Sequence, residues 1–140
     1  MYLLDTNVVS ESRRIAAGRG DPRVAAWLEA VAEDAAFISA MTVFELELGI
    51  LQVEHDRQQA AVLRKWVEET VLANFADRIL PMTGAIALRC AGLHVPDPFS
   101  ERDGWIAATA LEHNLTIVTR NTKDFVRSGA SIINPWEAAR

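Results

Sequence analysis

The chain opens with Tyr2-Leu3-Leu4-Asp5-Thr6-Asn7, a short apolar run that ends abruptly in three polar residues. Such a run favours a buried strand followed by a polar turn. Similar apolar runs recur along the chain, and helical patterns separate them. The predicted strands cover residues 2–4, 36–39, 78–82, 115–118 and 131–133. Because strands alternate with helices, the pattern predicts a three-layer α/β/α domain around a mainly parallel central sheet of four to five strands.

The segments between the strands carry helix-start signals. Residues 10–20 are polar and contain glycine, which is typical of a short helix or a loop. Further helices are predicted to start at Asp21-Pro22, at a capping box from Thr42 to Glu45, at Asp56 with Gln59, at Thr83 and near Asp103. Asn114 ends the last of these helices, and a short helix is predicted after the polar turn that begins at Thr119.

Length and composition limit the class of protein. A chain of 140 residues, half of them hydrophobic and 24% charged, predicts a single globular domain over residues 1–140. The one cysteine, Cys90, excludes an internal disulfide and a zinc cluster of cysteines. No apolar run approaches the roughly 20 residues that span a bilayer, and the first residues do not resemble a signal peptide. We therefore expect a cytoplasmic protein without a membrane partner.

The charge balance restricts how the chain can bind nucleic acid. It has 14 basic and 19 acidic residues, which gives a net charge of −5. Proteins that hold nucleic acid mainly by neutralising phosphates are usually basic. Either nucleic acid is not the ligand, or a cation lies between the protein's carboxylates and the phosphate.

Four acids stand near the ends of predicted strands: Asp5, Glu45, Asp103 and Asp124. In an open parallel sheet, ligands bind beyond the carboxyl ends of the strands, so these side chains are expected to converge. Gathered carboxylates repel one another unless a cation compensates them, and Mg²⁺ prefers oxygen ligands. The pattern indicates a divalent-metal site through which an acidic protein can bind RNA or DNA.

Each acid also has a simpler structural interpretation. Asp5 fits the cap of a turn, and Glu45 fits the end of a capping box that begins at Thr42. Asp103 suits the positive end of a helix dipole, and Asp124 suits a solvated turn. None of the four is decisive alone, so the prediction depends on their assembly.

Four blocks follow one another along the chain: Leu4-Asp5-Thr6-Asn7, Glu45-Leu46-Glu47-Leu48-Gly49, Asp103-Gly104-Trp105-Ile106-Ala107-Ala108-Thr109-Ala110 and Val118-Thr119-Arg120-Asn121-Thr122-Lys123-Asp124-Phe125. In this order they resemble the signature blocks of PIN-domain ribonucleases, and more narrowly of VapC-type toxins from toxin–antitoxin pairs. The closing Ile133-Asn134-Pro135-Trp136 also fits that group.

The resemblance implies a metal-dependent endoribonuclease that uses Mg²⁺ or Mn²⁺, cuts RNA and acts as the toxin of a toxin–antitoxin pair. It implies catalytic and metal-binding roles for Asp5, Glu45, Asp103 and Asp124. Some members carry the last acid where Asn121 stands. The side chains that would orient carboxylates and water are Thr6, Asn7, Thr119 and Asn121. The resemblance also implies a homodimer and a cognate antitoxin that covers the acidic cleft.

Alternative functions stay open at this point. A metal-dependent phosphohydrolase with an aspartate nucleophile also has Asp after its first strand, but it usually has a second Asp where Asn7 stands. A receiver-type signalling domain needs a lysine after the last strand, and Ile133-Asn134-Pro135 supplies none. A non-catalytic α/β binding module needs no converging carboxylates. No Gly-rich phosphate loop is present, which excludes a P-loop enzyme.

Other polar and aromatic residues have structural interpretations. No metal-ligand spacing links the three histidines, so a histidine-based nuclease is disfavoured; they are His55, His94 and His113. Packing in the core or in a dimer interface explains the helical tryptophans better than RNA stacking does; these are Trp27, Trp66 and Trp105. Two interpretations, solvated surface charge or phosphate binding, fit the arginines near the blocks, namely Arg13, Arg14, Arg19, Arg102 and Arg120.

Overall fold

The five strands form one parallel sheet in the order β3-β2-β1-β4-β5. The computed structural model describes residues 1–137. The strands are β1 (Tyr2–Leu4), β2 (Ala36–Ser39), β3 (Ile79–Leu80), β4 (Thr116–Val118) and β5 (Ile132–Ile133). Each lies within or coincides with a predicted apolar run. Because β1 and β4 are neighbours in the centre, Tyr2 near the start of the chain pairs with Thr116.

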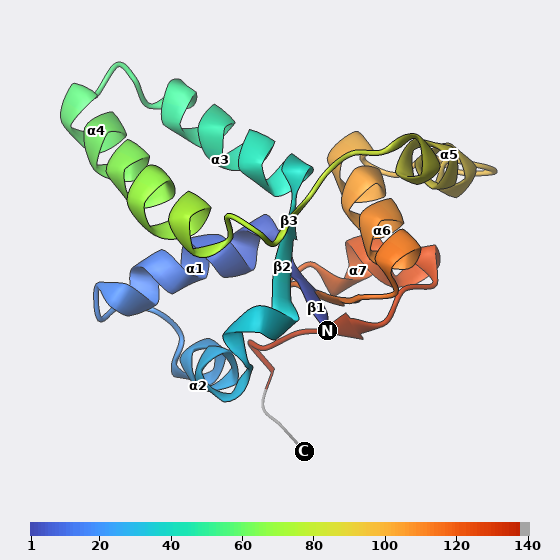
Figure 1. Cartoon of the computed structure of the whole chain (residues 1–140), viewed down its shortest axis with the longest axis horizontal. Helices are drawn as coiled ribbons and strands as arrows, with labels where there is room; N and C mark the ends of the chain where they lie inside the picture. Colours follow the sequence, from blue (N-terminus) through green and yellow to red (C-terminus); the bar gives the residue numbers. More distant parts are fainter. Residues whose placement is uncertain (138–140) are drawn as a thin grey trace.

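Helices pack on both faces of this sheet, as the three-layer prediction requires (Figure 1). One side carries α1 (Thr6–Ala16), α2 (Pro22–Ala30) and α4 (Arg57–Trp66), and the other carries α5 (Gly84–Leu93), α6 (Glu101–His113) and α7 (Thr122–Phe125). Helix α3 (Ala40–Gln52) leaves the end of β2 and contacts α1, α4 and α6. Short helical turns, Glu33–Ala35, Val67–Leu72 and Val126–Ser128, complete the described elements.

The strand residues divide their side chains between the two layers. Successive side chains of a strand point to opposite faces, so neighbours in an apolar run enter different cores. Leu4 and Val118 pack with Val8 beneath α1 and α2. Leu3 and Ile117 pack with the other core, against α6 and α7. All five side chains are at most 4% exposed, which confirms that the central strands are buried on both faces.

Helix α1 begins earlier than the sequence predicts. The polar residues after β1 were expected to form a turn, with a short helix or loop over 10–20, but the helix already begins at Thr6. Asp5 has extended dihedral angles, φ −69° and ψ 158°, and its carboxylate accepts the Thr6 backbone N–H. Asp5 is therefore the N-cap of α1. The strand passes into the helix without an intervening turn, which fixes Asp5 between two regular elements.

The predicted capping box at Thr42 is wrong. Ser39, the last residue of β2, caps α3 by accepting the Thr42 N–H, and Thr42 lies fully buried within the first turn. Glu45 is consequently free of any capping role. The caps predicted at Asp21, Asp56 and Thr83 are confirmed, since each side chain accepts a backbone N–H of its helix. Helix α6 begins at Glu101, so Asp103 lies in its first turn.

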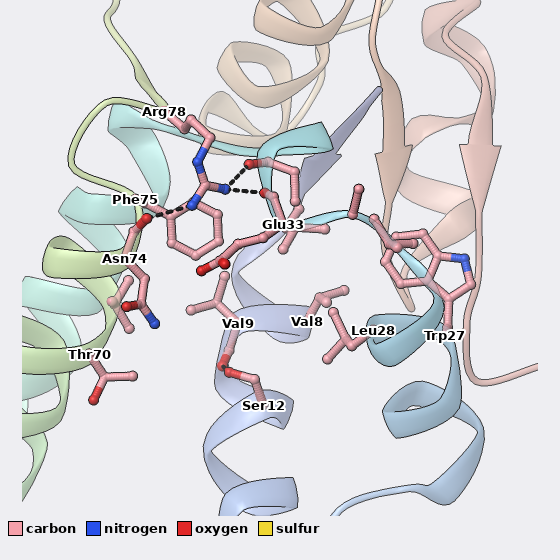
Figure 2. A pocket seen from close by; sticks show the side chains of 15 residues that line it. Val8, Val9, Ser12, Trp27, Leu28, Glu33, Thr70, Asn74, Phe75 and Arg78 are labelled. Carbon is pink, nitrogen blue, oxygen red and sulfur yellow. Dashed lines mark hydrogen bonds between the residues drawn. The ribbon is translucent and has the colours of Figure 1, made fainter.

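Arg78 hydrogen-bonds two separate segments of the chain together. The Arg78 guanidinium donates to the backbone carbonyls of Glu33, Ala36 and Asn74 and lies 4.8 Å from the Phe75 ring centroid (Figure 2). Glu33 and Ala36 belong to the segment that leads into β2, and Asn74 belongs to the segment after α4. Charged donors make stronger hydrogen bonds than neutral ones, so Arg78 links the helical turn after α4 to the start of β2.

Candidate functional site

A polar cleft of about 420 Å³ opens where β1 and β4 end, beside the first turns of α1 and α6. It gathers six of the eight residues predicted for the site, from four separate segments of the chain. The residues that line it are Asp5, Thr6, Asn7, Ser10, Glu11, Arg14, Glu45, Asp103, Arg120, Asn121 and Trp136. Two predicted residues do not line it: Thr119 is fully buried, and Asp124 is exposed nearby.

Asp5 is buried and held on both carboxylate oxygens. Its Oδ1 accepts the Thr6 N–H at 2.8 Å, and its Oδ2 accepts the Thr119 hydroxyl at 2.7 Å. The Asn7 amide donates to Oδ2 at 3.4 Å and to the Thr119 hydroxyl oxygen at 3.3 Å. Burial raises the pKa of Asp5, the two strong hydrogen bonds oppose that rise, and the charges of Glu45 and Asp124 add to it. Hydrogen bonds thus fix the orientation of the carboxylate, while burial and the nearby charges disfavour its ionised form.

Glu45 reaches the cleft from the middle of α3. The Thr6 hydroxyl donates to its Oε1 at 2.8 Å and lies 3.1 Å from the Thr42 hydroxyl oxygen. Its Oε2 lies 3.6 Å from the Arg102 guanidinium. Thr6 thereby connects Glu45 to the residue next to Asp5. Arg102 also stacks 5.5 Å from the Phe44 ring centroid, so its charge is directed to Glu45.

Asp103 carries the clearest electrostatic signal. Its pKa is raised to about 6, first by burial and then by the charges of Asp5, Asp124 and Glu45. Burial is the larger cause, and the contributions of the three neighbouring acids show that their charges act on Asp103. Asp5, Glu45 and Asp103 line one cleft, and Asp124 lies outside its lining but near enough for its charge to act on Asp5 and Asp103.

This raised pKa has a measurable consequence for stability. Because Asp103 is easier to protonate when folded, its charge destabilises the fold as the pH rises from about 4 to about 6, and the penalty persists above that. We expect Asp103→Asn to match wild type at pH 4 and to have a higher melting temperature at pH 7. Thermal unfolding in EDTA at both pH values tests this, and an equal difference at pH 4 and pH 7 would contradict it.

The last acid lies at the rim. Asp124 belongs to α7 and is exposed, yet its charge raises the pKa of both Asp5 and Asp103. Asn121 lines the cleft, and its backbone N–H donates to the Thr119 hydroxyl oxygen at 3.0 Å. Both residues are therefore placed to complete the acidic site. Asn121 offers an amide, and Asp124 offers a charge.

The donor set suits a hard divalent cation. The ionisable donors that approach one another are carboxylates, whose oxygens Mg²⁺ and Mn²⁺ prefer, and the mutual repulsion at Asp5 and Asp103 is what a dication relieves. Within residues 1–137, no three His, Cys, Asp or Glu side chains are drawn tightly enough together to hold an ion as they stand.

The sequence offered Arg14 and Arg120 as possible phosphate-binding residues, but it did not identify Ser10, Glu11 or Trp136 as residues of the cleft. Ser10, Glu11 and Arg14 follow Asn7 at intervals of three and four, so they share a face of α1 once the helix is known to begin at Thr6. The sequence predicted a helix or loop only from residue 10, so this shared face was not recognised. Trp136 follows β5 and lines the cleft while packing into the core at 8% exposed. Its block was noted in the sequence, but no role was assigned to it.

The histidines, the cysteine and the helical tryptophans lie outside this cleft. His94 accepts the Phe99 N–H at 3.1 Å through Nδ1, whereas His55 and His113 are exposed. Cys90 is buried at 4% exposed. The predicted core role of the helical tryptophans is confirmed, because Trp27, Trp66 and Trp105 pack against the core clusters.

A separate hollow of about 390 Å³ lies on the far side of α1. Figure 2 shows Val8 and Val9 of α1 facing Leu28 and Trp27 across it. Its lining is mostly apolar and contains none of the four acids of the cleft.

Comparison with known proteins identifies the family. The family model described as PIN domain matches residues 2–129. Toxin FitB of Neisseria gonorrhoeae is 37% identical over 97% of this chain and 99% of its own length. VapC ribonuclease Y4jK of Sinorhizobium fredii is 35% identical over 99% of this chain and 100% of its own length.

Solved structures agree with the sequence relatives. The crystal structure of FitAcB from Neisseria gonorrhoeae superposes with a TM-score of 0.89 at 36% identity and covers 99% of this chain and 100% of that one. A toxin–antitoxin complex from Klebsiella pneumoniae gives a TM-score of 0.66 at 27% identity, covering 99% of this chain and 100% of that one. None of the helices within residues 1–137 is long and apolar enough to cross a membrane. The family model, the curated relatives and the fold all agree with the four sequence blocks, and the chain belongs to the PIN-domain family.

Proposed function

We propose that this chain is an endoribonuclease that hydrolyses RNA phosphodiester bonds and acts as the toxin of a toxin–antitoxin pair. The observation that carries the proposal is the convergence of Asp5, Glu45 and Asp103 on one cleft, with the pKa of Asp103 raised to about 6 by burial and by its neighbours. Relatives named as a toxin and as a VapC ribonuclease, each matching nearly the whole chain, support the same activity.

We further propose that Asp5, Glu45 and Asp103 hold Mg²⁺ or Mn²⁺, with Asp124 or Asn121 at the rim. When bound, such an ion makes a water molecule more acidic and stabilises the leaving oxygen. Other residues of the chain position these carboxylates. Thr119 and Asn7 fix Asp5, and Thr6 fixes Glu45, through the hydrogen bonds described above. No histidine lines the cleft, so proton transfer falls to the carboxylates and solvent.

An aspartyl-phosphate mechanism fits the geometry less well. Both oxygens of Asp5 accept hydrogen bonds, which lowers their nucleophilicity. Such enzymes usually have a second acid where Asn7 stands. The Asn7 amide instead donates hydrogen bonds to Asp5 and Thr119. A metal-binding role uses the same carboxylate without requiring it to attack.

The direct test is RNA cleavage by the purified chain with and without added Mg²⁺ or Mn²⁺. We expect cleavage with either ion, none in EDTA, and recovery when the ion is restored. Asp5→Asn run beside wild type controls for contaminating nuclease. Cleavage that persists in EDTA, or that is equal in Asp5→Asn, would refute the metal-dependent ribonuclease.

We also propose two protein partners and a cytoplasmic location, where RNA and a cognate antitoxin are both accessible. The antitoxin would cover the acidic cleft. The second partner is another copy of the chain: Phe44 and Leu51 on α3 and Leu88 on α5 are 51%, 48% and 79% exposed, on helices that flank the β3 edge (Figure 1). We propose that these side chains form part of the contact between the two copies. Light scattering should give twice the 15.5 kDa chain mass, and a single-chain mass would contradict the dimer.

A further inference from the structure

Two arginines stand where the acidic cleft meets a second hollow. Arg14 of α1 and Arg120, two residues beyond β4, line the cleft that holds the carboxylates. Both also line a neighbouring polar hollow of about 470 Å³, together with Glu11, Arg19, Gly20 and Asp21. The hollow thus holds three arginines beside two carboxylates, of which Glu11 pairs with Arg14 and Asp21 pairs with Arg23 of α2.

Arg14 is held in place by a buried carboxylate. Its Nε lies 3.2 Å from Glu11 Oε1, and its terminal nitrogen donates to the Arg19 carbonyl at 3.3 Å. Glu11 is only 9% exposed, and its other oxygen accepts the Asp21 N–H at 2.7 Å. Glu11 therefore joins α1 to the start of α2 and orients Arg14. The Arg14 side chain is still 60% exposed, and a guanidinium has five N–H donors, so donors remain for a ligand.

Arg120 is held from the other side of the cleft. Its guanidinium carbon lies 5.4 Å from the centroid of the Trp136 ring, and its backbone N–H donates to Asn7 Oδ1 at 3.4 Å. Trp136 is itself packed in the core. Among residues 1–137, no carboxylate oxygen lies within 4 Å of the Arg120 guanidinium. Its charge is thus oriented by an aromatic face and not neutralised by an acid.

We propose that Arg14 and Arg120 form a phosphate clamp, which holds the RNA backbone at a phosphate adjoining the scissile one, and that Glu11 and Trp136 position them. This inference rests on the proposed ribonuclease function. A guanidinium pairs with two phosphate oxygens at once, a geometry that lysine cannot match. A chain with a net charge of −5 repels RNA overall, so its affinity must come from cations concentrated beside the site.

The first experiment measures KM and kcat for a mixed-sequence, single-stranded RNA with a fluorophore and a quencher, in Mn²⁺ at several KCl concentrations. Arg14→Gln and Arg120→Gln should each raise KM roughly 10- to 100-fold with little change in kcat. Each should also reduce the slope of log KM against log salt by about one. The matched control is Arg57→Gln, an exposed arginine at the start of α4, which should leave both constants unchanged.

Glu11 distinguishes positioning from simple charge. Removing a negative charge beside RNA would by electrostatics alone lower KM. If Glu11 orients Arg14, Glu11→Gln should instead raise KM, and it should add little when Arg14→Gln is already present. Circular dichroism of each variant shows whether the fold persists, because Glu11 also binds the Asp21 N–H.

The outcomes separate this inference from the function on which it rests. If wild type cleaves no RNA, the proposed function fails. If wild type cleaves RNA but Arg14→Gln and Arg120→Gln keep its KM and its salt slope, only the clamp is overturned. A fall in kcat at constant KM would also overturn it, because the arginines would then act on the reacting phosphate.

Discussion

Asp5→Asn is expected to reduce RNA cleavage by roughly a thousand-fold, since a bound metal ion supplies several kcal/mol of transition-state stabilisation that a neutral amide cannot secure. The fold should persist. Asparagine retains an oxygen to accept the Thr6 N–H, and its amide nitrogen can donate to the Thr119 hydroxyl oxygen. Initial cleavage rates and thermal unfolding of the same preparation measure both effects.

Asp77→Asn is the matched control for that change. Its side chain is 90% exposed and lies in the turn before β3, so the same loss of charge there should leave cleavage at the wild-type rate. Calorimetric titration with Mn²⁺ adds an independent readout, because Asp5→Asn should lose metal uptake along with cleavage. Wild-type cleavage by Asp5→Asn would show that Asp5 is only the cap of α1.

Phe125→Ala is expected to lower the free energy of unfolding by about 3–5 kcal/mol, the range for a large aromatic side chain removed from a packed core. Phe125 is fully buried and packs with Leu3, Ile106 and Ile117. It also anchors α7, a helix of only four residues that carries Asp124. We therefore expect cleavage to fall by more than the loss of folded protein explains.

The neighbouring residue provides the comparison for this core substitution. Val126 is 67% exposed, and Val126→Ala should change the free energy of unfolding by no more than about 0.5 kcal/mol. Urea denaturation of both variants measures the difference. A loss below about 1 kcal/mol for Phe125→Ala would mean that α7 contributes little to the core on its side of the sheet.

The sheet could be predicted because its central strands are continuous apolar runs. Leu3-Leu4 and Ile117-Val118 must be buried on both faces, which only a sheet covered by helices allows. The acids at the strand ends then follow from parallel topology, because all the carboxyl ends share one rim. Some helix starts could be predicted because their signals are local and do not depend on tertiary packing. These signals are the proline at the start of α2 and the caps at Asp21, Asp56 and Thr83.

The sequence could not settle features that depend on burial. Asp5-Thr6-Asn7 has the composition of a turn and also of a helix start, because the same short polar side chains serve both. Ser39 and Thr42 both have hydroxyls suited to capping α3, and the full burial of Thr42 inside the helix decides between them. Glu11 resembles a surface acid until the approach of α2 buries it.

The hydrogen bond from Thr119 to Asp5 joins residues 114 positions apart. Contacts between such distant parts of a chain form late in folding, because a long loop must close first. During synthesis on the ribosome, Asp5 lacks the hydrogen bond from Thr119 until residue 119 has been made. A copy truncated before β4 lacks both Thr119 and the strand that pairs with β1, so it cannot orient Asp5 as the whole fold does.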